Sequence, residues 1–94
     1  MSKLDDFGAD IVHRCRWVLD HNNGHPLSAW STAERLAVAL VLYDLDHLAG
    51  MDYTPTEAAQ RVADGMWDPP ADFNAWLQGI RAELQTPIRK RVKR

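Results

Sequence analysis

The 94 residues of the chain form one domain of a size that folds without disulfides or metal ions. Its 46% hydrophobic and 26% charged residues are ordinary for a soluble globular protein. The net charge of −2 is unevenly spread, because residues 1–86 carry six Lys/Arg and thirteen Asp/Glu, whereas residues 87–94 carry five basic residues and no acid. We therefore expect an acidic domain over 1–86 and a basic tail over 87–94.

Several features indicate the cellular compartment. The single cysteine, Cys15, excludes an internal disulfide and favours a reducing environment. The first ten residues are acidic and lack the apolar run of a signal peptide. The longest apolar run, Leu36 to Tyr43, is far shorter than the roughly 20 residues that cross a bilayer. We expect a soluble, cytoplasmic protein with no membrane partner.

The first predicted helix runs from about Leu4 to His21. Its apolar residues recur at spacings of three and four, which is the pattern of an amphipathic helix: Leu4, Phe7, Ile11, Cys15 and Val18. Asn22-Asn23-Gly24 supplies a C-terminal stop, since Asn and Gly accept the left-handed cap conformation. Residues 25–30 are predicted to form a loop.

The stretch from Ser31 to Gly50 organises the rest of the chain and contains the second predicted helix. Ser31 and Glu34 form a capping box at its start. A helix that is apolar on nearly all sides must be covered by other elements, so we predict a central helix that runs to about Leu48.

Two further helices follow. Thr54, Pro55 and Glu57 predict a capped helix from Pro55 to about Met66. A last helix is predicted from about Pro70 to Gln85, with Asp68 or a neighbour as its cap. The predicted fold class is therefore all-α, a single small four-helix bundle-like domain with a disordered basic C-terminal tail.

No residue pattern indicates catalysis or a bound cofactor. The four histidines, His13, His21, His25 and His47, lack the ligand spacings of zinc sites. Cys15 lies on an apolar stripe, where an inert buried thiol is expected. There is no Gly-rich phosphate loop and no nucleophile motif around Ser28 or Ser31. We expect no enzyme activity, no metal and no cofactor.

Nucleic-acid binding is an alternative. Thr54 to Val62 looks like the first helix of a helix-turn-helix, and Asn74, Gln78 and Arg81 would then lie on the reading helix. The connection from Asp64 to Pro70 is long for that motif, and the following helix is poor in basic groups.

The tail is the stronger nucleic-acid signal. It could bind nucleic acid weakly and without sequence preference, meet an acidic protein such as the acidic domain of another copy, or aid solubility. Its basic residues are Arg89, Lys90, Arg91, Lys93 and Arg94.

The four tryptophans are many for this length. Trp30 and Trp67 are predicted to lie in connections between helices. They either cover the ends of the small core or anchor a partner protein, because Trp is prominent among interface hot spots. The surplus of apolar residues also makes a homodimer a reasonable hypothesis.

From Pro26 to Met66 the chain resembles small proteins encoded by phages of mycobacteria and other actinobacteria. The residues that carry the resemblance are AWSTAERLAVALVL, then HL and MDYTPTEA. These phage proteins have no firmly assigned activity, so the resemblance implies a context: an accessory protein that binds a host or phage protein in the host cytoplasm. We expect a non-enzymatic protein–protein interaction module, with nucleic-acid binding or transcription regulation as the alternative.

Overall fold

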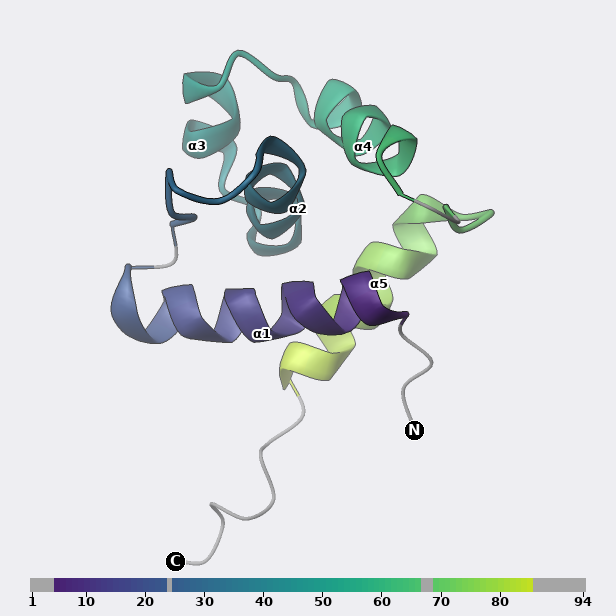
Figure 1. Cartoon of the computed structure of the whole chain (residues 1–94), viewed down its shortest axis with the longest axis horizontal. Helices are drawn as coiled ribbons and strands as arrows, with labels where there is room; N and C mark the ends of the chain where they lie inside the picture. Colours follow the sequence, from purple (N-terminus) through teal and green to yellow (C-terminus); the bar gives the residue numbers. More distant parts are fainter. Residues whose placement is uncertain (1–4, 24, 67–68, 86–94) are drawn as a thin grey trace, which may run out of the picture.

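The computed structural model of the chain describes residues 5–23, 25–66 and 69–85 (Figure 1). Within these ranges the chain forms five helices and no strand, which confirms the predicted all-α class: α1 Asp6–His21, α2 Thr32–Leu42, α3 Leu45–Gly50, α4 Pro55–Asp64 and α5 Phe73–Gln85. None of the described helices combines the length and hydropathy that a bilayer crossing needs. The expected count of four helices was wrong, because the central helix is divided into α2 and α3.

Helix α2 is the centre of the domain. It packs against each of the other four helices, and Figure 1 shows it between α1 on one side and α3 and α4 on the other. Its residues 36–41 are all buried, each with at most 7% of its surface exposed. The core is completed from α1 and α5 by Ile11, Cys15, Val18, Trp76, Leu77 and Ile80, and from α4 by Ala58 and Val62. The prediction of a helix buried on nearly all sides is confirmed for α2.

Both predicted capping boxes are formed. The Ser31 hydroxyl accepts the Glu34 N–H at 3.2 Å, and the Glu34 carboxylate accepts the Ser31 N–H at 3.0 Å. At the start of α4, Thr54 and Glu57 make the same reciprocal pair at 3.1 and 3.0 Å. Each box gives partners to backbone N–H groups that a helix start otherwise leaves free.

The predicted continuation of the central helix to Leu48 was wrong, because α2 ends at Leu42. Tyr43 adopts the left-handed conformation, with φ 58°. The Asp44 N–H then donates to the Ala39 carbonyl at 2.8 Å, and the Tyr43 N–H donates to the Leu40 carbonyl at 3.3 Å, which is a Schellman motif. Asp44 starts α3 by accepting the His47 N–H at 3.1 Å. Tyrosine seldom adopts this conformation, so the sequence gives little sign that the helix ends within its apolar run.

Helix α5 begins at Phe73, three residues later than predicted. The Asp72 carboxylate accepts the Ala75 N–H at 3.1 Å and so acts as the N-cap, while the predicted cap Asp68 lies outside the described residues. Asp5 caps α1 by accepting the Gly8 N–H at 2.7 Å. The Asp5 carboxylate also accepts the Trp76 indole N–H at 3.3 Å, which joins the start of α1 to α5.

Loss of the Ser31 hydroxyl tests the importance of the cap on α2. We expect Ser31→Ala to lower the free energy of unfolding by about 1 kcal/mol, because one N–H at the helix start loses its acceptor. The measurement is urea unfolding followed by circular dichroism. The matched control is Ser28→Ala, an exposed loop serine, which should change stability by less than about 0.5 kcal/mol. Equal effects of the two changes would contradict the assigned cap.

Candidate functional site

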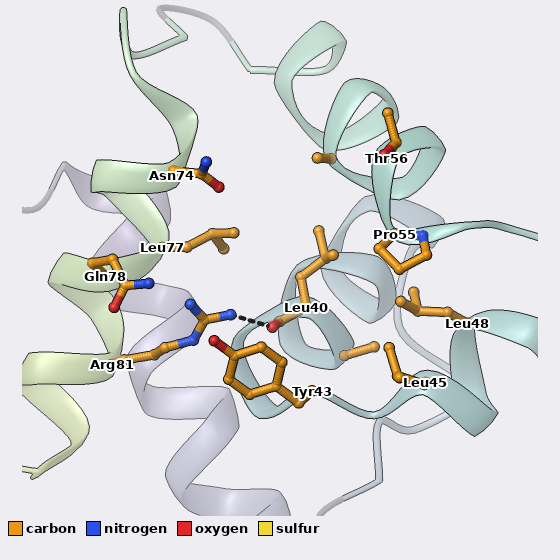
Figure 2. Close-up of a pocket in the computed structure, with 12 residues that line it drawn as sticks. Leu40, Tyr43, Leu45, Leu48, Pro55, Thr56, Asn74, Leu77, Gln78 and Arg81 are labelled. Carbon is orange, nitrogen blue, oxygen red and sulfur yellow. Dashed lines mark hydrogen bonds between the residues drawn. The ribbon is translucent and has the colours of Figure 1, made fainter.

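A groove opens beside the C-terminal end of α2. It has a volume of about 630 Å³, with α5 on one side and α3 and the start of α4 on the other (Figure 2). The α5 side carries Asn74, Leu77, Gln78 and Arg81, and the opposite side carries Leu45, Leu48, Pro55, Thr56 and Ala59. Ala39, Leu40 and Tyr43 come from α2 and its cap. Most of these side chains are apolar.

The groove has a buried base and an exposed rim. Leu40, Leu48 and Leu77 are each at most 7% exposed and belong to the core. On the rim, Leu45 is 57% exposed and Tyr43 is 67% exposed, which makes them two of the large hydrophobic residues that the domain leaves in water. Such exposed apolar surface beside a hollow is typical of a binding site.

Short side chains on α4 leave the hollow unfilled. Proline, threonine and alanine at positions 55, 56 and 59 line this side of the groove. None of them reaches far enough to cover the leucines of the base. Helix α3 has only six residues and borders the hollow on one side.

Arg81 closes one end of the groove and caps α2. Its Nε–H donates to the Val41 carbonyl at 3.0 Å, and its Nη2–H donates to the Leu40 carbonyl at 2.7 Å (Figure 2). Its guanidinium lies 4.1 Å from the centre of the Tyr43 ring, which is a cation–π contact. Because α2 has no basic residue in its own last turn, Arg81 also supplies the positive charge that a helix C-terminus favours.

The amides of Asn74 and Gln78 face the same groove. Both residues are exposed, and within the described part of the chain neither side chain has a hydrogen-bond partner. Asn74 and Gln78 are the residues predicted to read bases if α5 were a recognition helix, and the structure brings them onto the same side of α5 as Arg81, the basic residue of that helix. There Arg81 is committed to α2, whereas the two amides remain able to donate and accept hydrogen bonds.

A polar cluster lies at the junction of α2 and α3. The His25 ring nitrogen Nδ1 is 2.7 Å from the Asp44 carboxylate, whose side chain is only 8% exposed. His47 lies nearby, and its buried Nε2 has no partner among the described residues, as is also true of the Arg35 Nε. Burial lowers the pKa of His47, and the positive charge of Arg35 lowers it further, whereas Asp44 raises it. These effects together favour the neutral form of His47 relative to a free histidine.

The structure places Trp30 against the core rather than free in a loop. It is half-buried, with the Arg14 guanidinium 4.9 Å from its ring centre and the Trp17 ring meeting it edge-on at 6.4 Å. Arg14 is itself held by Asp10 at 2.6 Å and Glu34 at 3.1 Å. Trp17, by contrast, is 38% exposed. The other proposed anchor, Trp67, and the basic residues of the tail, Arg89, Lys90, Arg91, Lys93 and Arg94, lie outside the described residues.

The other candidate residues are poorly suited to nucleophilic catalysis or metal binding. Burial raises the pKa of the Cys15 thiol to about 12, so the reactive thiolate is suppressed. Over the described ranges, no three His, Cys, Asp or Glu side chains converge as metal ligands. The groove is therefore the most developed candidate site in this part of the chain.

The chain matches no protein-family model, and no curated protein sequence or solved structure is significantly similar to it.

The role of Arg81 can be tested through stability. We expect Arg81→Met to lower the free energy of unfolding by about 1–3 kcal/mol, because two carbonyls at the end of α2 lose a charged donor. The free energy of unfolding of Arg81→Lys should lie between those of Arg81→Met and the unchanged protein, since an ammonium lacks the planar fork that meets both carbonyls. Chemical unfolding of the three proteins measures this. Arg61→Met, at an exposed position on α4, is the control and should cost less than about 0.5 kcal/mol.

The neutral state of His47 predicts a pH dependence. Its pKa in the folded protein lies below the value of 6.5 for a free histidine, so the unfolded chain binds the proton more readily. Stability should therefore fall as the pH drops through about 6.5. In His47→Gln this fall should be smaller when the free energies of unfolding at pH 7.5 and 5.5 are compared. Identical pH profiles would contradict a neutral His47 in the folded state.

Proposed function

We propose that this protein is a non-enzymatic protein–protein interaction module. The observation that carries the proposal is the groove beside α2, where Tyr43 and Leu45 stay exposed at the edge of a hollow with a leucine base. Exposing two large apolar side chains is unfavourable in an isolated domain. The cost is recovered when a partner covers them, so the arrangement fits a surface that is buried in a complex.

The shape of the groove favours a protein segment over a small molecule. Its volume of about 630 Å³ falls in the range of ligand pockets, about 300–1,000 Å³. Pockets for small molecules bury most of the ligand, whereas the rim of this one is more than half exposed at Tyr43 and Leu45. An open groove of this kind suits apolar side chains that project from a partner's backbone.

The context of the proposal comes from the resemblance over Pro26 to Met66. The resemblance implies an accessory protein that acts by binding a host or phage protein, and an open apolar groove suits that role. We therefore place the protein among phage accessory proteins of the host cytoplasm, with a host or phage protein as its partner.

Nucleic-acid binding is the second candidate, and the basic composition of residues 87–94 favours it. The helix-turn-helix form of this candidate has little support, because Arg81 donates to α2 carbonyls and is not free for phosphates. Binding would then rest on the tail. A full chain that shifts duplex DNA at low salt, and loses the shift without residues 87–94, would favour this candidate.

The proposed function predicts that partner capture depends on Leu45. Purified tagged protein is incubated with lysate of an actinobacterial host, and retained proteins are quantified by mass spectrometry. We expect Leu45→Ser to reduce retention of a specific partner about tenfold, the effect of losing a central apolar contact.

The matched control is Leu19→Ser, because Leu19 on α1 is similarly exposed, at 54% against 57% for Leu45, and does not line the groove. It should retain the partner as the unchanged protein does. If no retained protein distinguishes the two variants, the groove is not the binding surface.

A further inference from the structure

We propose that the basic tail, residues 87–94, docks in cis on a second hollow of the domain, at the start of α1. This hollow is separate from the groove, so the inference does not depend on the proposed function. It joins three observations: an apolar hollow lined by two carboxylates, a tail in which an apolar residue stands between cations, and a helix end from which that tail can reach the hollow.

The second hollow lies between the start of α1 and the end of α4. Both helices pack on α2, but neither packs closely on the other, and a space of about 420 Å³ remains. Its apolar walls are Phe7, Ala33, Val62 and Met66. The short side chain of Ala33 and the lack of a side chain at Gly65 help to keep this space open.

Two exposed carboxylates, Asp5 and Asp6, line the same hollow. Asp5 accepts the Gly8 N–H and the Trp76 indole N–H with one oxygen, Oδ1, and its Oδ2 makes no hydrogen bond with the described residues. Within the same ranges the Asp6 carboxylate has no hydrogen-bond or ion-pair partner. A cation that enters the hollow would therefore meet carboxylate oxygens that are able to accept its hydrogen bonds.

Arg61 of α4 lies near the hollow without reversing its charge. Its Nη1 is 3.6 Å from the position that a Cβ on Gly65 would take. One guanidinium stands against two carboxylates, so the negative sign is kept. Residues 1–86 as a whole have the same sign, with thirteen acidic and six basic side chains, and such a field favours a cationic segment.

The tail has the chemistry that suits this hollow. In its sequence, PIRKRVKR, Val92 stands between Arg91 and Lys93. A valine side chain placed against the apolar walls loses contact with water, which is favourable. The cations on either side of it can form charge-assisted hydrogen bonds with Asp5 and Asp6.

The end of α5 brings the tail within reach of the hollow. The Trp76 indole donates to Asp5, and Gln85, the last residue of α5, is nine residues further along, which is about 14 Å of helix. With the length of the indole added, the end of α5 lies within about 20 Å of the hollow. An extended chain spans about 3.3 Å per residue, so residues 86–91 cover about 20 Å. Val92 can therefore reach the hollow without any movement of the helices.

Attachment to the domain makes a weak contact sufficient. A tethered segment meets a site within its reach at an effective concentration in the millimolar range, so a contact with a Kd of about 1 mM is occupied about half of the time. Docking of this kind withholds the cations of the tail from nucleic acid and from other acidic proteins. Such partners would bind the tail only in competition with its own domain.

The test places a spin label on the tail of the full chain. Arg94→Cys introduces a thiol for a nitroxide reagent, whereas Cys15 stays unlabelled because it is buried and its pKa is raised to about 12. The nitroxide broadens the NMR signals of nearby amides. We expect the amide signals of Asp6, Phe7 and Met66 to lose at least about half of their intensity, and salt at about 0.5 M to restore it.

His21 is the internal control. Arg16 donates to the Glu83 carbonyl at 2.9 Å, so the end of α5 lies near the later half of α1. Along α1, His21 is five residues from Arg16, whereas Asp6 is ten residues from it. A tail without a docking site would broaden the His21 signal at least as strongly as that of Asp6, and this result would overturn the inference.

Two matched variants test the free carboxylate. Asp6→Asn should weaken docking about threefold, because one ion pair is lost. Asp46→Asn also removes an exposed carboxylate from the first turn of a helix, but it does not line the hollow and should leave the broadening unchanged. Equal broadening in the two variants would contradict docking at this hollow.

A mixed sample separates docking in cis from docking between copies. Spin-labelled chains without isotope are mixed with isotope-labelled chains that carry no spin label. We expect the signals of Asp6, Phe7 and Met66 to keep their intensity in this mixture. If they broaden as strongly as in the singly prepared protein, the tail comes from a second copy and docking in cis is overturned.

Discussion

A helix buried on all sides leaves its two backbone ends as the polar groups that the surrounding fold must satisfy. In α2 the start is satisfied locally, by the Ser31–Glu34 box. The end is satisfied in part locally, by the Tyr43 and Asp44 N–H groups, and in part from a distance, because Arg81 of α5 donates to two α2 carbonyls and stacks on the Tyr43 ring. Packing around α2 and capping of α2 are therefore achieved by the same neighbouring helix. The position of α5 is thus fixed by hydrogen bonds as well as by its apolar face.

The same constraint creates the candidate site. The chain must turn where α2 ends, and the left-handed Tyr43 turns it so that the tyrosine ring and Leu45 come to lie at the surface. Helix α4 then covers α2 with small residues, Ala58 in the core and Ala59 at the groove. Small residues allow the helices to approach closely at one point but cannot fill the space beside it. The groove is the space beside α2 that α4 and α5 leave unfilled.

Local signals in the sequence were sufficient for much of the fold. The two capping boxes, the apolar stripe of α1 and the buried run of α2 were predictable because each depends on residues within about one or two turns of one another. The division of the central helix was not, since a possible cap at Asp44 is only a weak local signal and tyrosine seldom takes the left-handed conformation. The start of α5 was misplaced because Asp68 and Asp72 are both plausible caps beside two prolines.

The candidate site was less predictable than the fold, and for a physical reason. Arg81 and its two carbonyl partners are 40 and 41 residues apart, so no local pattern joins them. Trp30 was a predicted partner anchor, yet it is held by Arg14 and Trp17, and the exposed rim is made of Tyr43 and Leu45. A residue becomes available to a partner when the domain fails to cover it, which depends on the size of its neighbours. Here the short side chains of α4 decide which apolar residues stay in water.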